Sequence, residues 1–304
     1  MKTRKVWSRE RAGHWFILAA AMLWGTTGTA QTFAPQDAQP EAVGAIRLAI
    51  GGLALLALAI MRGALRIRLR WPILLTLLAA GSMAAYQPFF FAAVARTGVA
   101  VGTIIGIGSA PIIAGTLGYF VRREPPGRWW AFATILAVLG SALLVASNGG
   151  EVDIDRWGIV LALAAGTAYA VFTLASKQLL EGRPLDAVMA VVFCLGAVML
   201  TPVLFTADLA WLAQPNGLAV ALHLGLFATA MAYSLFVRGL AAVPVGTATT
   251  LSLAEPLTAG TLGLLVLNER LTTTGGFGFL LVVAGLALIS LHPEKLANRA
   301  FIRQ

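Results

Sequence analysis

Long apolar stretches separated by short polar breaks run along the whole chain. Each stretch is close to the roughly 20 residues that an α-helix needs to cross the hydrocarbon core of a bilayer. Charges, prolines and turn residues delimit ten of them: 14–33, 41–61, 72–94, 98–121, 128–147, 157–176, 185–206, 215–237, 244–267 and 274–291. The pattern predicts an all-α polytopic membrane protein with ten transmembrane helices and no sizeable soluble domain.

The composition supports a membrane protein and excludes several other classes. Of the 304 residues, 59% are hydrophobic and 12% are charged, whereas soluble domains have roughly half and a quarter. The single cysteine, Cys194, and three scattered histidines provide no disulfide framework and no metal cluster. The sequence has no phosphate-binding loop of the G-x-x-x-x-G-K-[ST] type and no nucleophile–base spacing. We therefore expect no cofactor, no metal and no catalytic residues.

Positive charge is distributed unevenly over the breaks between the stretches. The net charge is +9, and all but four of the 22 Lys and Arg residues fall at alternate breaks or at the two ends of the chain. Cytoplasmic loops carry this excess in membrane proteins, so both termini are expected in the cytoplasm of a bacterial inner membrane. The juxtamembrane position of the cations also speaks against nucleic acid as a partner. The four exceptions are Arg47, Arg96, Arg156 and Arg270.

The beginning of the chain allows two interpretations. Basic residues up to Arg11, an apolar stretch from Trp15 and small residues at 28–30 also describe a cleavable signal peptide. A retained first helix is favoured because Gly25-Thr26 corresponds to Gly166-Thr167 in the sixth stretch. Removal of one unit of a repeat would leave its counterpart unpaired.

The second half of the sequence repeats features of the first. Pro111 is followed by Ala-Gly-Thr-Leu-Gly at 114–118, and Pro256 is followed by the same five residues at 259–263. The offset of 145 also aligns Gly140 with Gly285. Coincidence between two apolar, glycine-rich segments is the alternative, but the matches keep the same order over several stretches. Five helices per copy make an inverted repeat, an arrangement in which substrates bind near the bilayer midplane. The predicted units are 1–148, 155–292 and a cytoplasmic tail, 293–304.

Several short motifs together resemble the EamA branch of the drug/metabolite transporter superfamily. They are Trp24-Gly25-Thr26, Arg47, Pro111 with Gly115, Glu255-Pro256 with Gly263, and Asn268-Glu269-Arg270-Leu271. The resemblance covers nearly the whole chain and is greatest to YddG-type bacterial exporters of aromatic amino acids. It implies a cavity lined by the first four helices of each copy, with the fifth of each at the periphery. The sequence departs from the pattern at Glu124-Pro125, where proline directly follows the usual glutamate.

Prolines inside the predicted helices mark candidate breaks. Proline removes one backbone hydrogen bond and frees a carbonyl one turn earlier, and in lipid such a carbonyl must find another partner. For Pro111 this carbonyl lies near Ile107, and for Pro256 near Ser252. A kink that only aids packing is the alternative for either proline alone. Their equivalent places in the repeat favour a shared function in helix breaking or gating, to which we add Pro88.

Three ionisable residues lie within the predicted helices. Glu255 is the only acidic residue deep in any of them, and an intramembrane charge is by default a functional hypothesis. It is interpreted as a proton sensor, a partner for a substrate ammonium, a partner for Arg47 or His223, or a carboxyl that fixes its helix. Arg47 either contacts substrate or extends to the membrane surface. His223 either carries protons or is a packing residue.

Aromatic residues concentrate in the helices that the resemblance assigns to the cavity. Aromatic rings stack on aromatic substrates and attract ammonium groups, whereas each of these rings taken alone is typical of a helix core. With the polar residues beside the prolines they complete the predicted substrate site: Trp24, Tyr86, Gln87, Phe90, Ser109, Tyr169, His223, Tyr233, Ser252 and Glu255.

These patterns predict a secondary transporter that exports a small, amino-acid-like metabolite with an aromatic or apolar side chain. The expected partners are this substrate and the lipid bilayer, and the expected state is a monomer or weak dimer. A drug or nucleotide-sugar type transporter is the alternative within the superfamily. A membrane scaffold or receptor that transports nothing is the alternative in another class.

Overall fold

The fold is described from a computed structural model over residues 2–65, 70–147, 155–268 and 272–292. The predicted tail 293–304, the loop cations Arg66 and Arg68, and residues 269–271 of the family motif lie outside the described residues. Within the described ranges the regular structure is helical throughout.

The helices follow the predicted apolar stretches closely at most positions. In chain order they are α1 (Lys2–Thr32), α2 (Pro40–Met61), α3 (Ile73–Arg122), α4 (Arg128–Ala146), α5 (Arg156–Leu179), α6 (Leu185–Met199), α7 (Thr201–Thr206), the 3-10 helix η1 (Ala210–Ala213), α8 (Pro215–Leu222), the π-helix η2 (His223–Met231), α9 (Ala232–Leu240), α10 (Val245–Leu251), α11 (Ala254–Val266) and α12 (Thr273–Leu291).

Seven helical segments of the described chain are long and apolar enough to cross a membrane. They are Pro40–Met61, Ile73–Gly98, Val101–Arg122, Arg128–Ala146, Arg156–Leu179, Pro215–Leu240 and Thr273–Leu291. The other three predicted spans coincide with α1, with α6 followed by α7, and with α10 followed by α11. Of these, α1 has polar residues at both ends, α6 ends ahead of Pro202, and the last pair is interrupted at Ser252 and Leu253. In the last two cases the interruption makes each individual helix shorter than the sequence pattern predicts, whereas α1, with 31 residues, is longer.

The chain reverses direction within the segment α3. Gly98 has φ 77° and ψ 164°, a conformation that only glycine adopts readily. A Cβ on Gly102 would lie 3.1 Å from the Cα of Val94, whereas residues eight apart in a straight helix are about 12 Å apart. The two halves of α3 are therefore separate helices joined by a tight turn, as the predicted spans 72–94 and 98–121 require.

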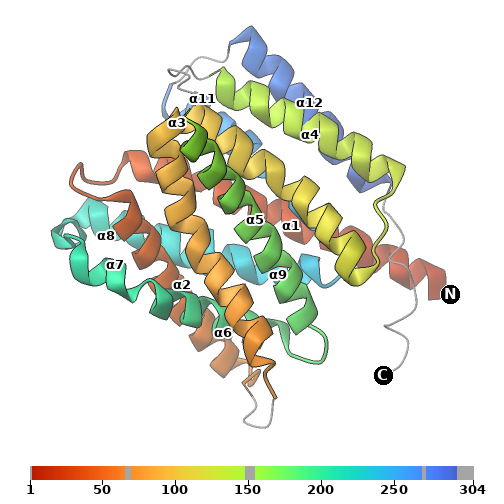
Figure 1. Ribbon diagram of the computed structural model, residues 1–304, viewed down its shortest axis with the longest axis horizontal. Coiled ribbons are helices and arrows are strands. Elements are labelled where there is room, and N and C mark those ends of the chain that lie inside the picture. The colour runs from red at the N-terminus through yellow and green to blue at the C-terminus, as the bar shows by residue number, and fades with distance from the viewer. Residues whose placement is uncertain (1, 66–69, 148–154, 269–271, 293–304) are drawn as a thin grey trace.

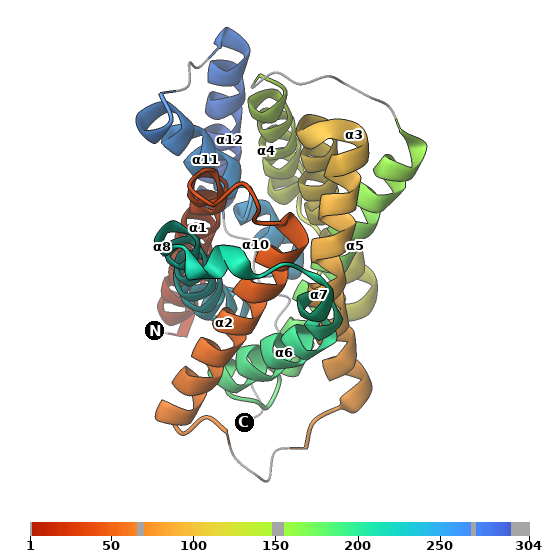
Figure 2. The same ribbon diagram turned by 90° about the vertical axis from the view of Figure 1, so that its left-hand side faces the viewer.

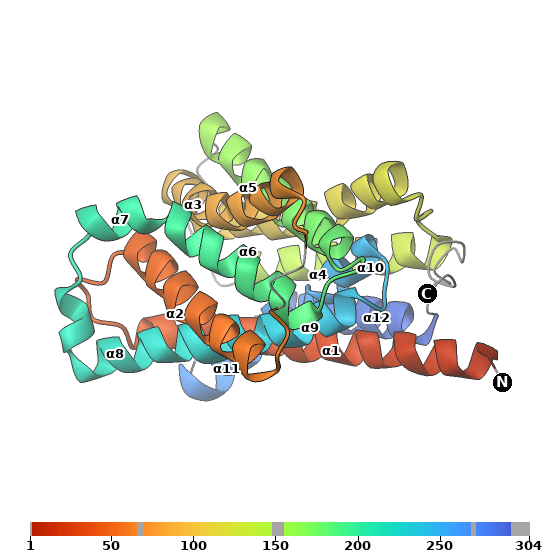
Figure 3. The ribbon, with the colours of Figure 1, turned by 90° about the horizontal axis from the view of Figure 1, so that it is seen from below.

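The helices form one bundle in which partners come from distant parts of the chain. α1 packs on α9 and α11, α2 on α6 and η2, and α3 on α5 (Figures 2 and 3). α4 and α12 lie side by side at one edge of the bundle (Figure 1). Each of these pairs joins the first half of the sequence to the second.

The α4–α12 pair has a reciprocal contact pattern. A Cβ on Gly140 would lie 2.6 Å from the carbonyl oxygen of Gly278 and 2.6 Å from the amide nitrogen of Val282. A Cβ on Gly285 would lie 2.7 Å from the carbonyl oxygen of Ala133 and 2.9 Å from the amide nitrogen of Ala137. Each residue on α4 is 145 positions from its counterpart on α12, so the two contacts exchange under the offset found in the sequence. Glycine on both sides lets the backbones touch.

Several ion pairs lie at one end of the bundle, around Asp186 and Glu124, and we call this end the basic end. Arg62 and Arg238 both contact Asp186, at 3.0 and 3.1 Å. Lys177, only 5% exposed, lies 3.3 Å from Glu124 and also donates to the carbonyl of Val243. These contacts join the ends of α2, α5, α6 and α9 to the segment between α3 and α4. The basic end is thus held together mainly by links between the two halves of the sequence.

Candidate functional site

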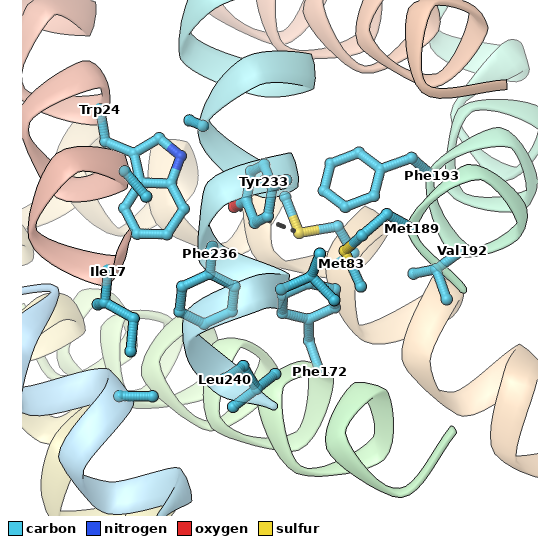
Figure 4. Packing of buried hydrophobic residues seen from close by; sticks show 14 of the residues in the cluster. Ile17, Trp24, Met83, Phe172, Met189, Val192, Phe193, Tyr233, Phe236 and Leu240 are labelled. Carbon is cyan, nitrogen blue, oxygen red and sulfur yellow. Dashed lines mark hydrogen bonds between the residues drawn. The ribbon is translucent and has the colours of Figure 1, made fainter. Parts of the chain in front are cut away.

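The interior of the bundle holds a cluster of aromatic rings. Trp24 of α1 lies with its ring centroid 4.9 Å from Tyr233, 5.3 Å from Phe236 and 6.3 Å from Tyr169. Offset and edge contacts at these separations are favourable for aromatic pairs. Figure 4 shows the rings of Trp24, Tyr233 and Phe236 turned toward one another from two helices. The interior positions of Trp24 and Tyr233, at 5% and 4% exposure, exclude a role as interface anchors.

A second group of rings extends the cluster to the first half of α3. Tyr86 lies 6.0 Å from Tyr169 and stacks on Phe90 at 5.8 Å and 17° between planes. The Tyr169 hydroxyl is 3.2 Å from the hydroxyl of Ser252. Tyr86 and Tyr169 are only partly buried, in contrast to Tyr233. All five predicted aromatic residues therefore belong to one chain of ring contacts, with its accessible part at Tyr86 and Tyr169.

Three phenylalanines outside the predicted site belong to the same cluster. Phe172, Phe193 and Phe236 are fully buried, and Phe193 lies 4.4 Å from Tyr233. No signal in the sequence distinguishes them from lipid-facing phenylalanines, because an apolar ring suits either side of a membrane helix. Phe172 and Phe193 pack against Tyr233, and Phe236 contacts both Tyr233 and Trp24 (Figure 4).

Glu255 is positioned by a break in the helix. α10 ends at Leu251 and α11 begins at Ala254, and the Glu255 amide donates to the carbonyl of Ser252 at 3.0 Å. This bond uses the carbonyl that the sequence analysis expected Pro256 to leave free. Glu255 therefore lies in the first turn of α11, where the helix dipole favours negative charge. Its side chain is partly buried, and within the described part of the chain no hydrogen bond or ion pair satisfies its carboxyl group.

The equivalent proline in the first half has a different effect. α3 continues through Pro111 without an interruption, and the only non-helical residue within α3 is Gly98. Pro88 also lies within α3, and its ring is exposed. The break is therefore one-sided and belongs to the segment that carries Glu255.

Glycines bring two helices into close contact with this region. A Cβ on Gly25 would lie 2.7 Å from the carbonyl oxygen of Glu255 and 2.5 Å from Cβ of Thr258. A Cβ on Gly166 would lie 2.6 Å from the carbonyl oxygen of Gly106 and 2.2 Å from Oγ of Ser109. The motif pair that the sequence aligned thus occupies similar positions, with α1 against α11 and α5 against α3. Ser109 is placed at this helix contact.

Arg47 reaches the site from α2. Its Nε donates to the hydroxyl of Thr229 at 3.4 Å, and Thr229 is fully buried. It is also close enough to Glu255, Tyr86 and Tyr233 to interact with them electrostatically. The contact with buried Thr229 thus places Arg47 beside the aromatic cluster.

The remaining predicted residues lie around this centre. The His223 ring nitrogen Nε2 is 2.8 Å from the Thr26 hydroxyl, and its ring stacks on Phe227 at 5.6 Å. Gln87 is buried against α2, with Oε1 3.4 Å from where a Cβ on Gly44 would lie. The contacts of His223 do not connect it to the tyrosines. Gln87 packs against Gly44, which lies about one turn of α2 from Arg47.

The centre of the bundle brings together aromatic rings, the unpaired carboxyl group of Glu255 and the guanidinium of Arg47. In the described residues no group of three or more His, Cys, Asp or Glu could hold a metal ion. A separate hollow of about 230 Å³, which includes open solvent, lies at the basic end beside Glu124 and Trp130. It shares no lining residue with the aromatic cluster.

Comparison with known proteins identifies the family. The model of the EamA-like transporter family matches twice, over residues 11–146 and 156–291. The chain is 48% identical over 280 residues to the uncharacterized transporter YwfM of Bacillus subtilis (strain 168), covering 92% of this chain and 94% of that one. It is 30% identical over 261 residues to the threonine/homoserine exporter RhtA of Escherichia coli (strain K12), covering 84% and 83%.

A solved crystal structure shows the same fold. It has 20% sequence identity and a TM-score of 0.80, and the match covers 92% of this chain and 96% of that one. The names of the family and of these relatives are those of transporters and not of enzymes. The two matches of the family model together span most of the sequence, and this chain therefore belongs to the EamA-like transporter family.

Proposed function

We propose that this membrane transporter exports small amino-acid-like metabolites, with the aromatic cluster and Glu255 forming the substrate site. The observation that carries the proposal is an unpaired carboxyl group inside the bundle, beside partly accessible tyrosines. Such a carboxylate suits a substrate ammonium, and the rings of Tyr86, Tyr169 and Trp24 suit an aromatic or apolar side chain. The name of the relative RhtA, an amino acid exporter, supports the same substrate class.

We further propose that the chain works as an inverted repeat of ten spans. The double match of the family model and the reciprocal contacts of Gly140 and Gly285 support this arrangement. In such transporters one half rocks against the other and exposes a midplane site alternately to each side. The distribution of Lys and Arg supports an orientation with the basic end in the cytoplasm of a bacterial inner membrane.

Counterflow in proteoliposomes tests the substrate class. Purified protein is reconstituted, loaded with unlabelled phenylalanine, leucine, threonine, an aromatic cationic drug or a nucleotide sugar, and then supplied with the labelled form. We expect accumulation of amino acids. Exchange of only the drug or the nucleotide sugar would favour the other branches of the superfamily, and no exchange of any compound would favour a scaffold.

A pair of variants tests the site itself. Trp24→Leu removes a ring of the cluster, whereas Trp157→Leu removes one that is 69% exposed. We expect the first change to lower phenylalanine counterflow about tenfold, since a lost ring contact and its buried area each contribute on the order of 1 kcal/mol. Trp157→Leu should transport like the unmodified protein. Equal activity of both variants would remove Trp24 from the site.

The role of Glu255 is tested separately. Glu255→Gln keeps the size of the side chain and removes its charge, so binding of a substrate ammonium should weaken. We expect counterflow to fall and to lose any dependence on pH that the carboxyl group confers. Unchanged transport at both pH 6 and pH 8 would exclude Glu255 from the mechanism.

A further inference from the structure

The unusual feature of α2 is an arginine in mid-helix without a carboxylate partner. Arg47 lies about 10 Å along the helix from Pro40, inside a 22-residue apolar span. Arg62, Arg96, Arg122 and Arg238 each form an ion pair, whereas no carboxylate in the described part of the chain lies within 4.0 Å of Arg47. A charged side chain at such a depth is costly and marks a pathway or a ligand partner.

The guanidinium is held in place from behind. The Thr229 hydroxyl donates its proton to the carbonyl of Leu224 at 2.8 Å, so its lone pair is oriented to accept from Nε of Arg47. The π-helix that carries Thr229 is locked onto α2, because a Cβ on Gly51 would lie 2.3 Å from Cγ2 of Thr229. The two terminal nitrogens of Arg47 have no hydrogen-bond partner among the described residues. Guanidinium groups bind carboxylates through a fork of two parallel hydrogen bonds.

Arg47 lies near the proposed substrate site. It is close enough to interact electrostatically with Tyr86, Tyr233 and Glu255, which come from three other helices. Gln87 lies against α2 one turn away and adds an amide to the same side. Since no ion pair closes Arg47 onto Glu255, the site has a positive pole and a separate negative pole. The aromatic rings lie in the same site.

We propose that Arg47 binds the carboxylate of the transported molecule, so that the site requires a zwitterionic α-amino acid. This inference rests on the proposed function, in which Glu255 receives the ammonium group. A molecule with only one of the two charges leaves the other pole unpaired inside the bundle, and an unpaired buried charge is costly. The site therefore excludes the amine and the amide that correspond to each amino acid.

Competition against the unmodified protein provides the first test. Proteoliposomes exchanging labelled phenylalanine are challenged with phenylalanine, phenylalaninamide and phenethylamine, and those exchanging threonine with threonine and threoninamide. We expect the amides and the amine to compete about 10- to 100-fold more weakly than the amino acids, the range for loss of a charge-assisted hydrogen bond. Equal competition by phenethylamine would overturn the requirement for a carboxylate while leaving amino acid transport in place. Absence of any amino acid exchange would instead refute the proposed function, and this inference with it.

Variants of Arg47 provide the second test. Arg47→Gln and Arg47→Lys are compared with Arg96→Gln, which removes an arginine from an exposed ion pair with Asp155. Ligand-induced thermal shifts of the purified protein report binding without transport. We expect Arg47→Gln to lose at least tenfold in phenylalanine affinity with no loss for phenethylamine, Arg47→Lys to fall between, and Arg96→Gln to match the unmodified protein. Equal losses for both ligands in Arg47→Gln would show that Arg47 only supports the fold. Should Arg47→Gln fail to fold, Arg47→Lys and the competition test still decide.

Discussion

Replacement of Lys177 by Met tests whether the buried contacts at the basic end stabilise the protein. Methionine keeps the length of the side chain and removes its charge. The change strips the Val243 carbonyl of its donor and removes the ion pair with Glu124 at 3.3 Å. Glu124 keeps Arg122 at 2.9 Å and the Val245 amide at 3.0 Å.

The expected cost follows from what remains paired. Removal of one partner from a buried ion pair lowers the free energy of unfolding by about 3–5 kcal/mol when the other charge is left without a partner. Since Glu124 retains two partners, we expect a smaller loss of roughly 2 kcal/mol, mostly from the buried carbonyl that loses its hydrogen bond. For a chain of 304 residues, that loss lowers the midpoint of thermal unfolding by roughly 3 °C.

Thermal unfolding of the detergent-solubilised protein, followed by tryptophan fluorescence, measures the effect. Arg96→Gln is the matched control, because Arg96 and Asp155 form an exposed pair with 53% and 28% accessibility. Exposed pairs contribute about 0–1 kcal/mol, so this midpoint should move by less than about 2 °C. A Lys177→Met midpoint that moves no further than that of Arg96→Gln would refute the argument that burial makes the Lys177 contacts strong.

Three further predictions concern pH and glycine packing. Burial raises the pKa of Glu124, but Lys177, the Val245 amide and Arg122 outweigh it and hold that pKa below its usual value. The stability that this group contributes is therefore present above about pH 4.3 and is lost as the pH falls through the lower folded-state pKa. Between pH 5 and pH 3 the unfolding midpoint should drop less in Glu124→Gln than in the unmodified protein, and equal drops would contradict this. Gly140→Val, with its Cβ 2.6 Å from the Gly278 carbonyl, should cost about 1–3 kcal/mol of stability. Gly25→Ala should lower amino acid counterflow, because its Cβ would lie 2.7 Å from the Glu255 carbonyl. Gly28, with open space around it, is the control for both: if Gly28→Val costs as much stability as Gly140→Val, or Gly28→Ala lowers counterflow as much as Gly25→Ala, close packing is not the cause.

Hydropathy predicted the helices well because span length is set by bilayer thickness and not by packing detail. The tight turn between Val94 and Gly102 is an example, since the polar break near Gly98 already separated two apolar stretches. The interruption at Ser252 and Leu253 was harder to predict. Pro256 indicated a disturbance there, but Pro111 gave the same indication in a helix that continues without a break. Whether a proline interrupts its helix depends on the packing of neighbouring helices, and this packing cannot be read from the local sequence.

Polar and mixed residues carried the prediction of the site. Trp24 and Tyr169 carry polar groups that do not suit lipid, so their mid-span positions indicated the interior. Phe193 carries no such group, and its burial behind Tyr233 follows only from the fold. Arg47 was ambiguous for a related reason. Its direction depends on Thr229, whose place is set by the π-helix.

The π-helix from His223 to Met231 gives one membrane span a surplus residue. A π turn holds one residue more than an α turn, and each residue of an α-helix rotates the chain by about 100°. Loss of a single residue between Leu224 and Ala230 would let the segment relax to an ordinary α-helix, and Tyr233 would still face Trp24 because the wide turn takes up the extra residue. The same loss in the α-helical part between the π-helix and Tyr233 would rotate the tyrosine by about 100°. The hydropathy of the span would hardly change. The π-helix thus makes this span tolerant of a one-residue change in length that an ordinary α-helix at the same place would convert into a different interior face.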